Sequence, residues 1–246
     1  MAPTKDWLEK WQEKKVLTAC PSNFEDYFTK SELFGQKLDI LSIGTVSIPT
    51  GEVIVRDPLV YLDRKSEPYF IKTPTGEFPT DICVVLAEED CARYAVVRVL
   101  FSENKVVRTE EALIGIENLD EIDGDAYFGF NVDAGLGCIA DKKVRDSFCD
   151  FEDQFRKNNP DANMYDDYFS GLFEKSYQEN PHYQRSGGDW LNWQIPGTQY
   201  NVPIFQSGFG DGTYPVYFGY DEENNVAALY IQFIAIELAY GDNEED

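Results

Sequence analysis

The Gly-rich segment Ser207–Tyr217 has the residue types of a constrained site. Three glycines stand at alternate positions, and Asp211 lies between two of them. Glycine suits positions where φ is positive or where another group approaches the main chain closely. Because a solvated turn needs fewer glycines, this density predicts a loop that holds Asp211 in a set position. The candidate binding residues are Ser207, Gly208, Gly210, Asp211, Gly212, Tyr214 and Asp221.

Several aspartates stand beside glycine or proline, where strands or loops are expected to end. Converging carboxylates could hold Mg²⁺ or Ca²⁺ through oxygen ligands. A carboxylate pair could instead perform acid/base hydrolysis, as in glycosidases. The candidate catalytic residues are Asp57, Asp133 and Asp211. The candidate metal ligands are Asp57, Asp133, Asp141 and Asp211, although the chain has no DxDxDG calcium loop and no cofactor is expected.

The same aspartates have a structural interpretation. Aspartate beside glycine often accepts hydrogen bonds from local backbone N–H groups. Asp141 precedes a helical pattern, and as an N-cap it would contribute about 0.5–2 kcal/mol. A buried carboxylate needs an arginine, a metal or several N–H groups as partner, and Arg56 and Arg98 are the arginines considered for that role. Both interpretations stay open for Asp211.

Other common chemistries are disfavoured. His182 is the one histidine, in a turn-like Asn-Pro-His-Tyr context, so histidine-based zinc sites and Ser-His-Asp triads become improbable. The Gly-rich loop precedes a strand and has no basic residue nearby, whereas phosphate loops open helices and carry Lys or Arg. Cys138 has the context of a small core residue. The odd number of cysteines, five, is typical of reduced thiols and predicts a cytoplasmic protein.

The charge balance favours a basic partner. The chain has 21 basic and 45 acidic residues, and its net charge is −24. Such a field repels nucleic acid and anionic membranes, and it steers basic proteins toward the surface. Simple solubility is the other interpretation of the charge. No apolar run approaches the roughly 20 residues that span a bilayer.

The order of the expected elements predicts an α+β fold. Strand patterns are numerous and helical patterns are few, so we expect one domain with a largely antiparallel, twisted or sandwich-like sheet. Ser22 and Glu25 form a capping-box pattern for a helix that Gly35 would end. The expected parts are a helical segment at about 1–36, a β-rich core at about 38–238 with a two-helix insertion at about 141–180, a strand pair at 126–132 and 136–139, an ordered loop at 179–198, and a frayed acidic tail at 241–246.

A short internal echo relates two of the aspartates. Gly51 and Asp57, like Gly135 and Asp141, are separated by five residues. In each case glycine opens a short apolar strand and an acid closes it, which places the two acids at equivalent strand ends. The echo either records a duplicated hairpin unit or is a coincidence of common turn signals.

Three segments together resemble a bacterial family of uncharacterised proteins. They are Gly51–Pro58, Val132–Asp141 and Ser207–Pro215, the last with Tyr220–Asp221 behind it. Their patterns are G-x5-DP, VDAGxGCxAD and SGxGDGxYPxY. The resemblance covers roughly residues 44 to 238 and implies no settled activity. Similar domains look like accessory or immunity-type proteins beside bacterial toxins.

These observations favour a non-enzymatic function. We expect a soluble bacterial protein of the binding or immunity type that engages a basic protein. The alternative is a metal- or carboxylate-dependent hydrolase that uses the clustered aspartates. A weaker alternative is a nucleic-acid mimic, which would need carboxylates spaced like phosphates along one face.

Overall fold

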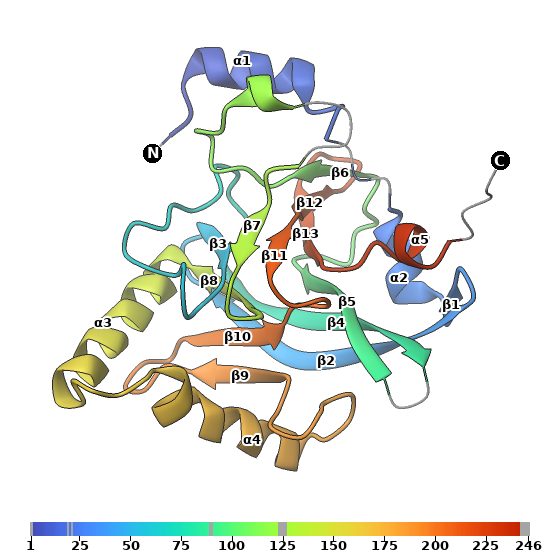
Figure 1. Cartoon of the computed structure of the whole chain (residues 1–246). Coiled ribbons are helices and arrows are strands. Elements are labelled where there is room, and N and C mark those ends of the chain that lie inside the picture. Colours follow the sequence, from blue (N-terminus) through green and yellow to red (C-terminus); the bar gives the residue numbers. More distant parts are fainter. Residues whose placement is uncertain (1, 19, 21, 89–90, 123–126, 242–246) are drawn as a thin grey trace.

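The fold is given by a computed structural model that describes residues 2–18, 20, 22–88, 91–122 and 127–241. It contains a seven-stranded sheet, a four-stranded sheet and a two-stranded ribbon (Figure 1), and every strand pairing in them is antiparallel. This confirms the predicted α+β class with mostly antiparallel sheets.

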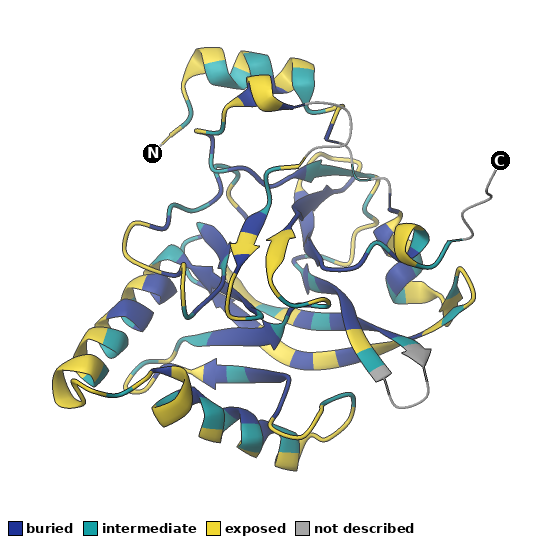
Figure 2. Ribbon diagram, in the orientation of Figure 1, coloured by how far each residue is buried: buried dark blue, intermediate teal, exposed yellow. Residues whose placement is uncertain are grey.

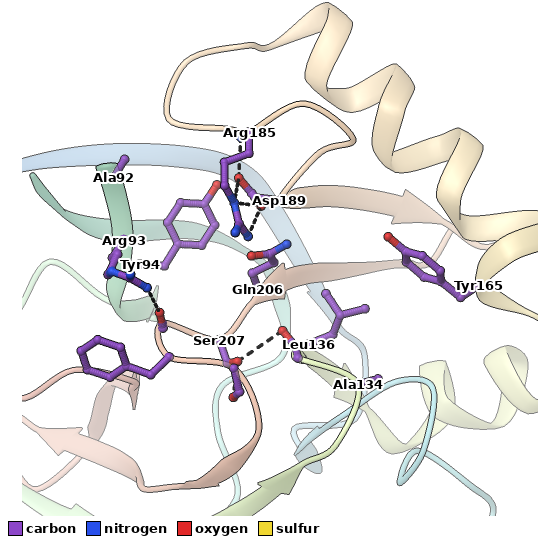
Figure 3. Close-up of a pocket in the computed structure, with 14 residues that line it drawn as sticks. Ala92, Arg93, Tyr94, Ala134, Leu136, Tyr165, Arg185, Asp189, Gln206 and Ser207 are labelled. Atoms are coloured by element: carbon purple, nitrogen blue, oxygen red, sulfur yellow. Dashed lines mark hydrogen bonds and ion pairs between the residues drawn. The ribbon is translucent and has the colours of Figure 1, made fainter. Parts of the chain in front are cut away.

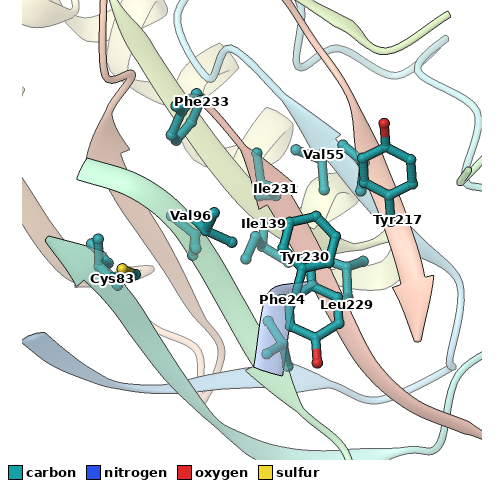
Figure 4. Packing of buried hydrophobic residues seen from close by; sticks show 14 of the residues in the cluster. Phe24, Val55, Cys83, Val96, Ile139, Tyr217, Leu229, Tyr230, Ile231 and Phe233 are labelled. Atoms are coloured by element: carbon teal, nitrogen blue, oxygen red, sulfur yellow. The ribbon is translucent and has the colours of Figure 1, made fainter. Parts of the chain in front are cut away.

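The seven-stranded sheet has the order β1-β2-β4-β5-β13-β12-β6. Its strands are β1 Glu32–Leu33, β2 Gln36–Ile48, β4 Gly76–Glu88, β5 Cys91–Leu100, β6 Arg108–Glu111, β12 Val216–Tyr220 and β13 Val226–Gln232. Valine, isoleucine and aromatic side chains fill its inner face, as β-propensity predicts. The rings of Phe24 and Tyr230 stack here with centroids 4.5 Å apart (Figure 4).

The four-stranded sheet has the order β3-β8-β10-β9. Its strands are β3 Val53–Arg56, β8 Leu136–Asp141, β9 Trp190–Gln194 and β10 Asn201–Gln206. Successive side chains of a strand point to opposite faces. Accordingly, Ile139 and Phe205 join the core shared with the larger sheet, whereas Cys138 and Ile204 join a second core beneath the helices. This sheet is therefore a middle layer that is buried on both faces.

Helices cover the outer face of the four-stranded sheet. The helix α3 (Lys142–Asn158) begins at its N-cap Asp141, as predicted, and buries Val144 and Phe148. A single π-helical turn, η2 (Tyr165–Phe169), leads directly into α4 (Ser170–Glu179). Burial therefore follows one stripe along each of these helices, and their opposite sides face solvent (Figure 2).

The remaining elements are short. The helix α1 (Lys5–Lys14) packs through Trp11 on a separate small core that includes Leu113 and Leu119. The other elements are the helices α2 Phe24–Thr29 and α5 Ile236–Ala239, the 3-10 turn η1 Leu119–Glu121, and the ribbon strands β7 Phe130–Val132 and β11 Gly212–Tyr214. None of the helices in the described ranges has both the length and the apolar character needed to span a bilayer.

Several local predictions were wrong. The N-cap of α2 is Asn23 rather than Ser22, whose hydroxyl instead accepts a hydrogen bond from Gln232. The chain then enters β1, so Gly35 lies in a strand turn and not at a helix end. The loop expected at 179–198 contains β9. The segments 130–132 and 136–141 do not pair with each other, because β7 pairs with β11 and β8 with β3 and β10. Residues 126 and 242–246 lie outside the described part.

Candidate functional site

Asp57, in the first motif segment (Gly51–Pro58), binds the turn of the second motif segment (Val132–Asp141). Asp57 is fully buried at the end of β3. Its Oδ2 accepts hydrogen bonds from the backbone N–H groups of Asp133 at 3.0 Å and Ala134 at 2.6 Å. Its Oδ1 accepts from the N–H of Leu59 at 2.9 Å. Three N–H groups thus satisfy this carboxylate. A buried carboxylate needs such donors, an arginine or a metal as its partner, and here the N–H groups fill that role.

The aspartate of the second motif binds the turn of the first motif in return. Asp141 is also fully buried, and its Oδ2 accepts from the N–H of Thr50 at 2.8 Å. The Thr50 hydroxyl donates to the same carboxylate, and the N–H of Lys143 donates to Oδ1 at 2.8 Å as the helix cap. Because β3 pairs with β8 from Val53↔Asp141 to Arg56↔Cys138, the two aspartates occupy opposite ends of one ladder. At about 3.3 Å per residue, four residues separate these ends by about 13 Å.

The Gly-rich segment reaches the same turn that Asp57 holds. The Asp211 Oδ1 accepts from the N–H of Gly135 at 3.1 Å, and the N–H of Ser207 donates to the Gly135 carbonyl at 3.0 Å. Gly135 has φ +66°, a conformation that glycine adopts without strain. All three motif segments therefore meet. We call this meeting point the triple-loop junction and define it as Asp57, Asp133–Gly135 and Ser207–Asp211.

The other predicted binding residues lie at different depths. Ser207, Gly208 and Gly210 line a pocket that is described below, and the Tyr214 hydroxyl donates to the Gly210 carbonyl. Gly212 begins β11 and pairs with Val132. Asp221 stands apart, in the turn between β12 and β13. There, donation from the Asn104 side-chain amide keeps the pKa of Asp221 below its ordinary value.

The predicted carboxylates are not arranged as one cluster. Asp57 and Asp211 both face the turn at Asp133–Gly135, but they bind different N–H groups of it. Asp133 contributes its N–H to the junction, and its side chain is exposed. Within the described residues, no three His, Cys, Asp or Glu side chains lie close enough together to hold a metal ion. The carboxylates of Asp57, Asp141 and Asp211 act here as acceptors of backbone hydrogen bonds.

A pocket of about 380 Å³ opens against the junction (Figure 3). We call it the arginine pocket, because the arginines in its wall are Arg93 and Arg185. Its lining residues are Ala92, Arg93, Tyr94, Ala134–Leu136, Tyr165, Arg185, Asp189 and Gln206–Gly210. Gly208 is required at this wall, since a Cβ there would stand 2.6 Å from the Tyr94 carbonyl oxygen. Burial raises the pKa of the Tyr94 phenol, whose hydroxyl donates to the Tyr183 carbonyl.

A second hollow of about 480 Å³ lies on the other side of Ala134 and Tyr165, which line both. We call it the Tyr165 groove. Its lining residues are Leu59, Val60, Ala134, Arg156 and Ala162–Asp166. Most of this wall is apolar, and its floor includes the turn that Asp57 holds. The junction thus separates two hollows of different chemistry.

Sequence reasoning missed the residues that come from outside the motifs. Arg93, Tyr165, Arg185 and Gln206 belong to β5, η2, the loop before β9, and β10. One local signal was available for Arg185. The pair Gly187-Gly188 before Asp189 marks a tight turn, and Gly188 lies so close to Phe173 that a Cβ would stand 2.2 Å from its carbonyl oxygen.

Two predicted structural residues are in the environments expected. Cys138 is fully buried, and burial raises the pKa of its thiol, so it stays protonated in the core. His182 is exposed, and its ring lies against that of Tyr183.

Comparison with known proteins identifies the family but no activity. A family model described as "Protein of unknown function (DUF4241)" matches residues 46–231 and so spans all three motif segments. Neither the curated proteins nor the solved structures contain a match. The chain therefore belongs to the DUF4241 family of proteins of unknown function.

Proposed function

We propose that this chain is a non-enzymatic, immunity-type binding protein that engages a basic protein partner through the Tyr165 groove. The observation that carries the proposal is an apolar hollow with an acidic rim on a chain of net charge −24. Interfaces bury apolar and aromatic side chains at their centre, while charged groups at the rim steer the partner.

The groove presents apolar side chains to solvent. Val60 is 45% exposed and Tyr165 is 38% exposed, although both are large. Tyrosine is enriched at the centres of interfaces because its ring is large and loses little rotamer entropy on binding. The π-helical turn at Tyr165–Phe169 sets the position of this ring, and such turns are frequent at functional sites.

The charges around the groove fit a basic occupant. Asp166 lines the groove, and Asp161 immediately precedes the lining residue Ala162; both acids are exposed. The cation in the lining, Arg156, is bound by Glu152 through hydrogen bonds of 3.0 and 2.7 Å. Because that guanidinium is already paired, the rim carries an excess of negative charge.

The use of the motif carboxylates supports binding over hydrolysis. Both oxygens of Asp57 and both oxygens of Asp141 accept hydrogen bonds from backbone or hydroxyl groups. A general acid or nucleophile needs an oxygen that is open to the substrate. Both aspartates therefore hold backbone turns, and Asp57 holds the one that contributes Ala134 to the groove.

The test is co-purification from a native lysate with wild-type protein and two charge variants. The first variant, Asp161→Asn with Asp166→Asn, removes two rim charges. The second, Glu222→Gln with Glu223→Gln, removes two exposed charges from the β12–β13 turn and is the matched control. We expect wild type and control to retain the same basic protein at low salt, with retention lost in the rim variant.

Salt dependence supplies the second readout. Raising the ionic strength shortens the Debye length from about 10 Å at 0.1 M to about 3 Å at 1 M, so the retained partner should be released. Failure to retain any basic protein at low salt would contradict the proposal. Equal retention by the rim variant and wild type would show that the groove is not the contact surface.

A further inference from the structure

We propose that the arginine pocket binds a small organic anion through its carboxylate or phosphate group. This inference concerns a different hollow from the Tyr165 groove and does not depend on the identity of a protein partner. The pocket volume of about 380 Å³ lies within the range of small-molecule sites. Its chemistry is defined by an excess of hydrogen-bond donors.

Arg93 supplies a guanidinium with spare donors. Its Nη1 donates to the Gly208 carbonyl at 3.2 Å, and its Cζ lies 5.4 Å from the centroid of the Phe209 ring. Among the residues whose side chains are described, Arg93 forms no ion pair with a carboxylate, and its contacts are the Gly208 carbonyl and the Phe209 ring. The two contacts hold the side chain beside the pocket mouth while leaving its Nε and Nη2 for a ligand.

Arg185 is held in place by a buried carboxylate. Asp189 is 6% exposed, and its Oδ1 accepts from Arg185 Nη2 at 2.7 Å and Nε at 3.0 Å. The Arg185 N–H also donates to the Asp189 Oδ2 at 2.5 Å. This fork leaves the Nη1 of Arg185 without a hydrogen-bond partner among the described residues. Asp189 is thus used to orient the arginine and has little capacity left to repel an anion.

Two neutral side chains complete the donor set. The Gln206 amide and the Tyr165 hydroxyl border the same space in Figure 3. Neither of these groups makes a hydrogen bond with the described part of the chain. Each can donate to an oxyanion. Donors from four separate elements therefore surround a pocket whose one lining carboxylate is already engaged.

The local charge differs in sign from that of the whole chain. Arg93, Arg185 and Asp189 give the lining a formal charge of +1, against −24 for the protein. At physiological salt, exposed charges beyond about 8 Å are largely screened, so the groups that set the local charge are the two arginines, Asp189, and the nearby Asp211, which accepts from the lining residue Gly135. The rings of Tyr94, Tyr165 and Phe209 and the side chain of Leu136 provide apolar surface for the ligand body.

The experiment titrates wild-type protein with benzoate, phenyl phosphate and the neutral analogue benzamide, followed by NMR chemical-shift changes and calorimetry. We expect at least one anion to bind and benzamide not to bind, and the tighter anion identifies the preferred head group. Arg93→Gln and Gln206→Leu should each weaken that binding about tenfold or more, since each removes a donor to a charged group. Arg64→Gln, an exposed arginine bound to Asp150 and Asp153 on α3, is the matched control and should bind as wild type does.

Three results would overturn the inference. The first is the lack of binding of either anion to wild type at about 10 mM, well above ordinary small-ligand dissociation constants. The second is equal binding of benzoate and benzamide, because the site would then not recognise charge. The third is unchanged anion affinity in both pocket variants, provided that circular dichroism shows them folded.

Discussion

The two ends of the β3/β8 ladder share one feature, a buried aspartate that holds a glycine turn, but the two turns have different surroundings. At each end, the aspartate of one motif accepts the N–H groups that precede or flank the glycine turn of the other motif. At the Asp141 end, the carboxylate also caps α3, so the turn is covered by a helix start. At the Asp57 end, the outer side of the turn is the wall between the arginine pocket and the Tyr165 groove.

The comparison of the two ends shows that a motif aspartate can have a structural role without itself lining a pocket. Both aspartates are fully buried and bound by backbone donors, so their chemistry is the same. At the Asp57 end, the held turn lines both hollows through Ala134. The motif aspartate Asp57 thus supports a wall that both hollows share, whereas the polar side chains proposed to bind a ligand, such as Arg93 and Gln206, come from outside the motifs.

The largest expected effect comes from removing either aspartate. Asp57→Ala and Asp141→Ala should each lower the free energy of unfolding by about 3 kcal/mol, because each leaves several buried N–H groups without partners. Urea denaturation monitored by circular dichroism measures the loss. Under conditions where both variants are folded, benzoate or phenyl phosphate binding should be impaired in Asp57→Ala and retained in Asp141→Ala. Equal loss of binding in the two variants would contradict the comparison.

Glu111 extends the comparison to a carboxylate that is only half satisfied. Its Oε1 accepts from the N–H groups of Phe128 at 2.6 Å and Gly129 at 3.1 Å, whereas its Oε2 is buried and has no hydrogen-bond partner among the described residues. Burial raises the pKa of Glu111 from 4.5 to about 7. The folded state therefore holds a proton that the unfolded state has already released.

The sign of the pH effect follows from that shift. The stabilisation from the Glu111 proton is complete below pH 4.5 and is lost as the pH rises from 4.5 to about 7, a change of up to about 3 kcal/mol. Glu111→Gln should remove this decline when unfolding is measured between pH 5 and pH 8. Glu77→Gln is the control, since Glu77 is exposed on β4 and is not among the groups that shift the pKa of Glu111, and it should keep the decline. An unchanged pH profile in Glu111→Gln would show that this carboxyl does not titrate in that range.

Gly208→Ala tests the wall of the open end directly. The added Cβ would stand 2.6 Å from the Tyr94 carbonyl oxygen and 2.8 Å from Ile234, so we expect a loss of about 2 kcal/mol from overpacking and displacement of the loop. The control Gly171→Ala adds a Cβ in α4 with no atom within 4 Å, and it should stabilise by up to about 1 kcal/mol. Thermal unfolding of the two variants gives the comparison, and equal melting temperatures would contradict it.

The smallest expected effect is at Asp211. Among the described residues, its exposed carboxylate accepts one hydrogen bond from the junction, from the Gly135 N–H. Asp211→Ala should therefore cost about 0.5–1 kcal/mol, much less than Asp57→Ala. A loss in denaturant stability as large as that of Asp57→Ala would mean that Asp211 has a further role at the junction.

The sequence predicted the residues of the junction but not their partners. The repeated Gly-x5-Asp pattern correctly placed Asp57 and Asp141 at strand ends, and the N-cap at Asp141 was confirmed. That the two segments pair with each other could not be predicted, because strand pairing across 80 or so intervening residues is set by tertiary packing and not by local preference. The β3/β8 register places each aspartate beside the glycine turn of the other segment, so the repeated pattern leads to reciprocal hydrogen bonds.

The residues missed by sequence reasoning share a physical reason. Arg93 and Gln206 alternate with buried residues on strands, where single polar positions normally face solvent. The prediction of a loop at Trp190–Gln194 was wrong because this short segment follows a Gly-rich turn and becomes the strand β9 through its pairing with β10. Pockets arise from such long-range pairings, so the arginine pocket was not visible before the fold was known.

Amide hydrogen exchange at the Asp133–Ala134 turn reports whether the Asp57 carboxylate holds that turn in place. Asp133 and Ala134 are exposed residues, yet their N–H groups donate to the buried carboxylate of Asp57. We predict that both amides are protected in the wild type and that Asp57→Ala, which removes the acceptor, lowers their protection at least about a hundredfold, while Asp141→Ala leaves it unchanged under conditions where both variants are folded. Unprotected exchange of these two amides in the wild type would contradict the account.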